Sequence, residues 1–319
     1  MSAKQSVSIG LALGSGSARG WAHIGVIEAL EENGIPIDFI AGTSIGAFVG
    51  AVYAAGDIKS LKEFALRMDW KMVLSYFDVV FPKSGFLDGK KVHDLFSMHT
   101  NVQTFADFRI PVRMLATDLN SGQQVILDSG NIIESIRASV SVPGIFTPVR
   151  RGNQMLVDGG LVNPVPVDVA RSMGADVVIA VDLNTGLVRR HADSVPRRTK
   201  STTSESAFDE LQNSKNETIA KLARSYVGAE KMIRDKIGSW FDRDDPKPNI
   251  LEVMGSSLGI MEEQIARINL ALNPPDVLIQ PRLGDIKMFD FDQAERSIAE
   301  GYQRTIEQMD AIQELIDRG

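Results

Sequence analysis

The chain contains no cysteine among its 319 residues. Disulfide bridges, thiolate nucleophiles and cysteine-ligated metal sites are therefore excluded. The chain also lacks any run of about 18 uncharged apolar residues, which is the length that a transmembrane helix needs. The first twenty residues hold neither a long apolar stretch nor the small-residue cleavage site of a secretory signal peptide. We therefore expect a cytoplasmic protein whose contact with a membrane, if it has one, is peripheral.

The chain also has no excess of basic residues over acidic ones. The chain has 34 Lys and Arg against 41 Asp and Glu, which gives a formal net charge of −7. A general nucleic-acid binder needs a basic face, so we expect no nucleic-acid partner. The hydrophobic content of 44% and the charged content of 24% are those of an ordinary globular protein.

Short apolar runs alternate with helical patterns along most of the chain. Runs without polar alternation are typical of strands buried on both faces of a parallel sheet. The alternation predicts an α/β fold with a mostly parallel central sheet flanked by helices. The expected strands are Val7–Leu13, Asp38–Ala41, Val112–Ala116, Val177–Asp182 and Val277–Gln280. The expected helices are Ala18–Glu32, Ile45–Ala55, Lys59–Arg67, Gly89–Phe96, Ile132–Ala138, Val167–Ser172 and Leu251–Leu272, then two more at about Asp292–Gly301 and Tyr302–Asp317. A hairpin is expected over Thr117–Ser129.

The composition becomes polar after Thr185. We expect a single domain over residues 1–319, with a core of about 7–184, a variable and partly mobile insertion of about 186–250, and a closing strand with C-terminal helices over 251–319. Within the insertion, Asn216–Phe241 reads as a basic amphipathic helix. Such a helix can lie on a membrane surface, or it can pack on its own domain or on a second subunit of a homo-oligomer.

Two segments match the pattern G-x-S-x-G, centred on Ser44 and Ser257. Ser44 follows a predicted strand and precedes a predicted helix, so it has the strand–turn–helix setting of a nucleophile, with Gly42 and Gly46 leaving room for a sharp turn. Ser257 lies inside a helical pattern. Context therefore favours Ser44, although a serine that only caps the following helix remains the alternative.

A glycine-rich loop, G-S-G-S-A-R-G, spans residues 14–20 between the first strand and the first helix. Its amide groups could hold a nucleotide phosphate, with Asp38 as the ribose-binding acid. They could instead form an oxyanion hole, or the glycines could serve only a tight turn. Two such loops after consecutive strands favour the oxyanion hole.

A serine nucleophile needs a base. None of the four histidines, His23, His93, His99 and His191, lies in a motif that supports this role. An acid stands out instead, because Asp158 is followed by two glycines that let the backbone turn sharply beside its carboxylate. A plain β-turn would explain this segment as well.

Together these motifs resemble the patatin-like phospholipase family, and more closely its bacterial branch related to neuropathy target esterase. The resemblance rests on four segments in the family's order: G-S-G-S-A-R-G-x-A-H-I-G-V at 14–26, A-G-T-S-I-G at 41–46, R-A-S-x-S-x-P-G-I-F-x-P-V at 137–149, and V-D-G-G-x-x-N-P-x-P at 157–166.

The resemblance implies a Ser–Asp dyad that needs no histidine, no metal and no organic cofactor. Ser44 would be the nucleophile and Asp158 its base. The oxyanion-hole donors would be backbone amides of Ser15, Gly16 and Ser17. Supporting roles would fall to Gly14, Arg19, Gly20, Gly42, Gly46, Gly159 and Gly160, and the segment around Pro143 and Gly144 would support the dyad.

The expected function is therefore serine acyl hydrolysis of lipid esters, as in a lysophospholipase or a phospholipase A. Two other classes stay open, namely a nucleotide-binding regulatory protein and a catalytically silent interaction protein on the same fold.

Overall fold

The computed structural model describes residues 7–69, 72, 94, 97, 102–187 and 250–318. The chain forms two compact units, one from residues 1–191 and 256–319 and the other from residues 192–255. Of the second unit, only residues 250–255 are described, in the first turns of helix α10. Among the described residues, no helix combines the length and the apolar character that crossing a membrane requires.

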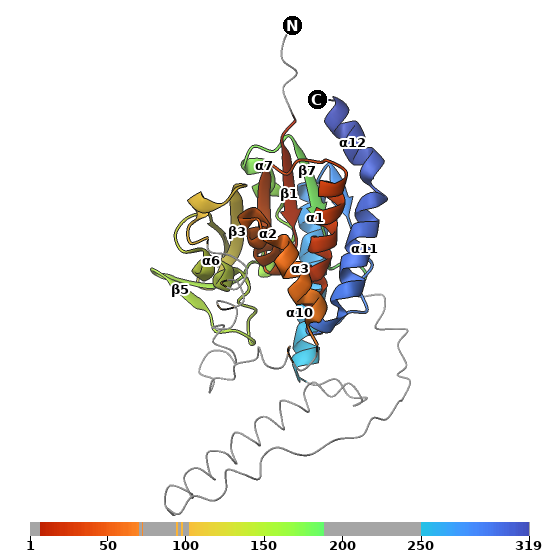
Figure 1. The fold of residues 1–319 in the computed structure, drawn as a ribbon. Helices are drawn as coiled ribbons and strands as arrows, with labels where there is room; N and C mark the ends of the chain where they lie inside the picture. Colours follow the sequence, from red (N-terminus) through yellow and green to blue (C-terminus); the bar gives the residue numbers. More distant parts are fainter. Residues whose placement is uncertain are drawn as a thin grey trace, which may run out of the picture. The chain divides into compact units, whose positions relative to one another are not determined.

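The first unit is built on a sheet of eight strands (Figure 1). The strands are β1 Ile9–Leu13, β2 Phe39–Thr43, β3 Val112–Asp118, β4 Gln123–Leu127, β5 Val149–Arg151, β6 Gln154–Asp158, β7 Val177–Val181 and β8 Val277–Ile279. Their order is β5-β6-β3-β2-β1-β7-β8, and β4 pairs with β3 off this path. The pairs from β3 to β8 along the order are parallel, and β4, β5 and β6 add antiparallel pairs at one end.

Helices cover both faces of this sheet. They are α1 Ala22–Glu32, α2 Ile45–Ala55, α3 Ile58–Arg67, α6 Ile132–Ser139, α7 Val167–Ser172, α10 Ile250–Leu272, α11 Ala294–Ile306 and α12 Met309–Arg318. Alternate residues of β1 face opposite ways, so Leu11 and Leu13 pack with α1, α2 and α11, whereas Ala12 packs with α7 and α10. Burial on both faces explains why the strands read as continuous apolar runs.

Helices α1 and α11 cross at very short distance, and they lie side by side in Figure 1. Gly25 of α1 and Gly301 of α11 make the crossing possible, because a Cβ atom on either would lie under 3.0 Å from backbone atoms of the other helix. The crossing fixes α11 against the helix that follows the glycine-rich loop.

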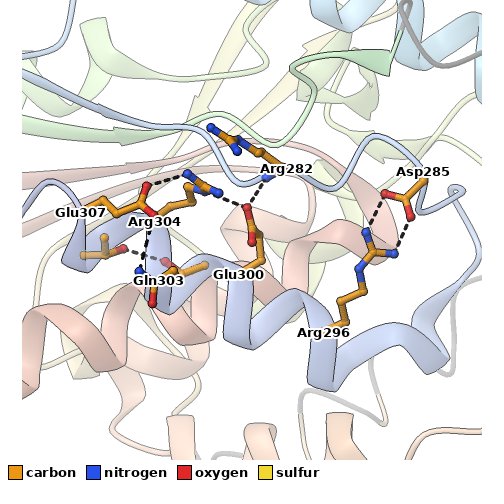
Figure 2. A network of polar contacts seen from close by, with 9 residues as sticks. Arg282, Asp285, Arg296, Glu300, Gln303, Arg304 and Glu307 are labelled. Atoms are coloured by element: carbon orange, nitrogen blue, oxygen red, sulfur yellow. Dashed lines mark hydrogen bonds and ion pairs between the residues drawn. The ribbon is translucent and has the colours of Figure 1, made fainter.

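The loop after β8, residues 280–290, is tied to α11 by a polar network (Figure 2). Glu300 Oε1 accepts from the Arg282 amide at 2.9 Å and from Arg304 Nε at 2.8 Å, and Arg296 pairs with Asp285 at 2.5 Å. Two carbonyl groups of residues 280–290 accept hydrogen bonds from the Ala18 amide and the Arg19 side chain, so the network supports the glycine-rich loop.

The expected fold class is confirmed: a mostly parallel sheet lies between two layers of helices. The predicted hairpin is present as β3 and β4. The first predicted helix is instead a 3-10 turn at Ser17–Trp21 followed by α1. The last two helices separate after Ile306 rather than at Gly301, because that glycine serves the crossing with α1 inside α11 and does not end the helix.

Several predictions fall largely or wholly outside the described residues. They are the helix at Gly89–Phe96, nearly all of the 186–250 insertion and its amphipathic helix at Asn216–Phe241.

Candidate active site

Ser44 lies at the carboxyl end of β2, one residue before α2 begins. Its backbone has φ 57° and ψ −123°, and Ser44 and Ser17 are the non-glycine residues with positive φ in the described chain. Such strained backbone persists only where surrounding contacts enforce it, and it is common at active sites. The conformation turns Ser44 sharply between strand and helix, as the G-x-S-x-G spacing predicts.

The Ser44 hydroxyl contacts the carboxylate of Asp158. Ser44 Oγ donates to Asp158 Oδ2 at 2.5 Å, and both residues are buried. Asp158 ends β6, and its other oxygen, Oδ1, accepts from the Gly160 amide at 2.8 Å. The two residues are 114 positions apart in the sequence and meet at one end of the sheet.

Burial dominates the electrostatics of Asp158. Removal from water disfavours the carboxylate, and the nearby charge of Glu262 adds repulsion, while the Ser44 and Gly160 hydrogen bonds oppose both effects. The balance raises the pKa of Asp158 to about 8. A carboxylate with a raised pKa is a stronger base, which suits the removal of a proton from a serine hydroxyl.

The segment 137–149 reaches the dyad through its serines. Ser139 Oγ accepts from the Ser44 amide at 2.9 Å and donates to Leu115 O at 2.6 Å. The Asp158 amide donates to Ser141 O at 2.9 Å. The sequence points to Pro143 and Gly144 for this support, whereas the hydrogen bonds to Ser44 and Asp158 come from Ser139 and Ser141, a few residues earlier.

The glycine-rich loop has two kinds of amide. The Gly14 and Ser15 amides donate to Val181 O at 3.0 Å and Pro164 O at 2.8 Å, so the Ser15 amide, one of the three expected oxyanion donors, is already engaged. The Gly16 and Ser17 amides have no hydrogen-bond partner among the described residues. These two amides remain available to an incoming oxyanion.

The supporting glycines lie in close contact with other parts of the chain, with backbone atoms nearest at Gly14, Gly42, Gly46 and Gly159, and with side chains nearest at Gly20 and Gly160. A Cβ atom would come under 3.0 Å from another residue at Gly14, Gly20, Gly42, Gly46, Gly159 and Gly160. At Gly46 the close neighbours are the Leu13 and Gly14 carbonyl groups, so the start of α2 packs directly on the glycine-rich loop. The loop and the Ser44 turn are therefore neighbours, as parallel strands β1 and β2 require.

Arg19 is buried beneath the loop. Its guanidinium donates from NH2 to Asn184 Oδ1 at 2.8 Å and from NH1 to Ile286 O at 3.1 Å. Burial lowers the pKa of Arg19, and the acidic side chains of Glu262 and Asp182 oppose that effect. Arg19 thus ties the loop to the segments after β7 and β8.

Glu262 is a residue of the site that the sequence does not predict. It comes from α10, about a hundred residues after Asp158, and Glu262 Oε2 accepts from Ser15 Oγ at 2.8 Å. The M-E-E-Q segment around it looks like any exposed helical face. No signal in a single sequence marks this glutamate, because only the packing of α10 brings it to the loop.

The other candidates for nucleophile, base or ribose ligand that the structure describes do not contact Ser44 or Asp158. His23 is buried below the loop and contacts the Gly14 carbonyl through Nε2 at 2.8 Å, and burial lowers its pKa to about 4, so it is neutral at pH 7. Ser257 lies exposed inside α10. Asp38, the candidate ribose ligand, accepts from the Ile9 amide at 2.7 Å. His93, His99 and His191 lie outside the described residues.

No group of three or more His, Asp or Glu side chains suited to a metal ion occurs in the part of the chain that the structure describes.

A strained serine on a strand–turn–helix, hydrogen-bonded to a buried aspartate beside a loop with two unpaired amides, is an arrangement typical of a serine hydrolase. The sequence profile described as "Patatin-like phospholipase" matches residues 11–171, which include the loop, Ser44 and Asp158. The chain is also 30% identical to "Uncharacterized NTE family protein Rv1063c" of Mycobacterium tuberculosis, over 96% of this chain and 92% of that protein. The chain therefore belongs to the patatin-like phospholipase family.

Other relatives are much longer than this chain. "Lysophospholipase NTE1" of Pyricularia oryzae is 38% identical over 186 residues, which are 56% of this chain but 12% of that protein. "Patatin-like phospholipase domain-containing protein 7" of Rattus norvegicus is 36% identical over 56% of this chain and 14% of its own length. Among solved structures, VipD from Legionella pneumophila aligns over 96% of this chain and 67% of its own, with a TM-score of 0.48 and 13% identity.

Proposed function

We propose that this chain is a serine acyl hydrolase that cleaves carboxylic esters of lipids with Ser44 as nucleophile and Asp158 as base. The observation that carries the proposal is the 2.5 Å hydrogen bond from Ser44 Oγ to Asp158 Oδ2, made by a serine in a strained turn. No histidine takes part in this bond. The aspartate therefore fills the role of the general base directly.

In the first half of the reaction, Ser44 Oγ attacks the ester carbonyl carbon while its proton passes to Asp158. The carbonyl oxygen becomes an oxyanion, which the unpaired amides of Gly16 and Ser17 stabilise. The carbon–oxygen bond to the alcohol then breaks, and the departing oxygen takes the proton from Asp158. This step leaves an acyl group on Ser44.

In the second half, Asp158 takes a proton from a water molecule, and the resulting hydroxide attacks the acyl carbonyl. The tetrahedral intermediate collapses, Ser44 Oγ recovers the proton and the free acid leaves. All proton transfers thus pass through one carboxyl group. The reaction needs no other acid or base.

The substrate class follows from the family. Two relatives that match this region carry the names lysophospholipase and patatin-like phospholipase, so we propose lysophospholipids or phospholipids as substrates. The nucleotide-binding alternative gains no support, because Asp38 and two loop amides are already bonded within the protein. Peripheral contact with a lipid surface remains part of the proposal.

The test is hydrolysis of lysophosphatidylcholine and of p-nitrophenyl butyrate by purified protein. We expect Ser44→Ala to lose at least about a thousandfold in kcat, because the nucleophile is gone. Ser257→Ala is the matched control, since it removes the serine of the other G-x-S-x-G segment, and it should keep the wild-type rate. Equal losses in the two variants, or full activity in Ser44→Ala, would refute the assignment.

A further inference from the structure

The Glu262 side chain connects helix α10 to the glycine-rich loop. Glu262 Oε2 accepts from Ser15 Oγ at 2.8 Å and from Asn184 Nδ2 at 3.2 Å. Asn184 Nδ2 also donates to Ser15 Oγ at 3.1 Å, and Arg19 donates to Asn184 Oδ1. A part-buried carboxylate therefore closes a polar network around the first residues of the loop.

The other oxygen of Glu262 lies beside the dyad. A Cβ atom built on Gly160 would lie 2.7 Å from Glu262 Oε1 and 3.1 Å from Asp158 Oδ1. The Gly160 amide donates to that same Asp158 oxygen. The carboxylates of Glu262 and Asp158 thus flank one glycine, with no room for a larger residue between them.

We propose that Glu262 is a positioning residue of the ester hydrolysis, which braces the oxyanion loop through Ser15 and holds a second acidic group against the Asp158 base. This inference rests on the function proposed above. It assigns to α10 a part in the reaction, although the helix lies outside the residues that match the family profile.

The charges around Glu262 make such a role physically consistent. The positive group that faces it is Arg19, and the negative groups are Asp158 on β6 and Asp182 after β7. Burial raises the pKa of Glu262, while the Ser15 hydroxyl, Arg19 and Asn184 stabilise its charged form. Glu262 and Asp158 are neighbouring acidic groups, so each makes ionisation of the other harder.

The consequence for the reaction has a definite direction. After burial, repulsion from Glu262 is the second cause that raises the pKa of Asp158. A neutral group in place of Glu262 lowers that pKa, so Asp158 ionises at lower pH but is a weaker base once ionised. The negative charge of Glu262 therefore lowers the activity at acidic pH and raises the activity at alkaline pH.

The experiment measures kcat/KM for p-nitrophenyl butyrate from pH 5 to pH 10 in wild-type protein and in Glu262→Gln. Glutamine keeps the length of the side chain and an oxygen that can accept from Ser15. We expect the acidic limb of the profile to move down by about half to one pH unit, which is a rise of roughly three- to tenfold at pH 6 relative to each plateau. The plateau itself should fall.

Two further variants separate charge from shape. Glu262→Asp keeps the charge but shortens the reach to Ser15, so its plateau should fall while its acidic limb stays at the wild-type position. Glu263→Gln removes one negative charge from the next residue of α10, whose carboxylate accepts from the Gly186 amide, and it should leave the profile unchanged. If Glu262→Gln melts below the assay temperature, Glu262→Met removes the same charge.

The outcomes are distinct. An acidic limb of Glu262→Gln that superimposes on the wild-type limb overturns the inference, whatever happens to the plateau, and leaves the proposed function intact. An equal shift in Glu263→Gln also overturns it, because the effect would then be general to the charge of α10. If the folded wild-type protein hydrolyses no ester, the proposed function fails and the inference fails with it.

Discussion

The surroundings of the Asp158 carboxylate have opposite effects on its strength as a base and on the stability of the fold. The proposed reaction needs a strong base next to Ser44, and the Asp158 carboxylate there is buried with a second acidic group nearby. The same surroundings make the charged form costly for the folded state. Activity at this residue is therefore expected to come at the expense of stability.

We predict that Asp158→Asn abolishes hydrolysis and stabilises the fold most at alkaline pH. The folded protein holds the Asp158 proton up to about pH 8, whereas the unfolded chain releases it near pH 4, so the free energy of unfolding falls as pH rises through this window. Asparagine does not ionise, so the variant does not show this fall in the free energy of unfolding. We expect a gain on the order of 2 kcal/mol at pH 8 and little gain at pH 4.5, measured by urea unfolding.

Asp118→Asn provides the control of opposite sign. Asp118 accepts from Ser121 Oγ at 2.8 Å, and its hydrogen bonds lower its pKa. Its charged form therefore stabilises the folded state above about pH 4, and that contribution disappears as pH falls. Asp118→Asn should lose stability at pH 8. A result in which both variants respond alike would show that the effect of Asp158 does not come from its raised pKa.

At the scale of elements, the crossing of α1 and α11 holds the helix that follows the glycine-rich loop of the site. Glycine inside an exposed helix normally costs about 1 kcal/mol relative to alanine, so its use here needs a reason. The reason is contact, because a Cβ at Gly301 would meet the Ala22 backbone at under 3.0 Å. Helix α1 follows the glycine-rich loop through a 3-10 turn, so a displaced crossing would disturb the amides that we propose as oxyanion donors.

We predict that Gly301→Ala destabilises the protein by about 1–3 kcal/mol, since the extra methyl group overpacks a backbone contact. Thermal unfolding measures the loss. Gly259→Ala in α10 is the matched control, because its Cβ would meet only the tip of the Leu187 side chain, at 3.1 Å. If Gly301→Ala were as stable as Gly259→Ala, the close crossing would not be a source of stability.

The sequence predicts some elements well for a physical reason. Strands such as β1 and β7 are buried on both faces, so their apolar runs and flanking glycines carry a local signal. The strand–turn–helix around Ser44 is local too. The 3-10 turn after the glycine-rich loop and the end of α11 depend on contacts with distant segments, so the local pattern misplaces both.

The candidate site divides in the same way. Ser44 and Asp158 stand in recognisable turns, and the structure brings their side chains together. Glu262 contacts the loop through its side chain from a distant helix, which leaves no local pattern in one sequence. Ser139 and Ser141 lie in the recognised segment 137–149, but their contacts with Ser44 and Asp158 depend on the fold. The engaged amide of Ser15 likewise depends on the Pro164 carbonyl of a remote loop.

At the scale of the whole molecule, the site draws on both ends of the described chain. The dyad and the loop come from residues 15–158, which lie within the family profile. Several of the groups that brace them come from beyond residue 250, in the segment after β8, in α10 and in α11. The match to the mycobacterial relative covers 96% of the chain, so it extends over both parts.

The central claim is that Ser44 is the nucleophile and Asp158 is its base. Its most direct test is to react the protein with a fluorophosphonate probe, to measure the mass of the protein, and to locate the modified peptide by mass spectrometry. We predict one adduct per chain, on Ser44, which is absent in Ser44→Ala and forms at least about tenfold more slowly in Asp158→Asn. Thermal unfolding of each variant confirms that it is folded. An adduct on another residue, or no adduct in folded wild-type protein, would contradict the account.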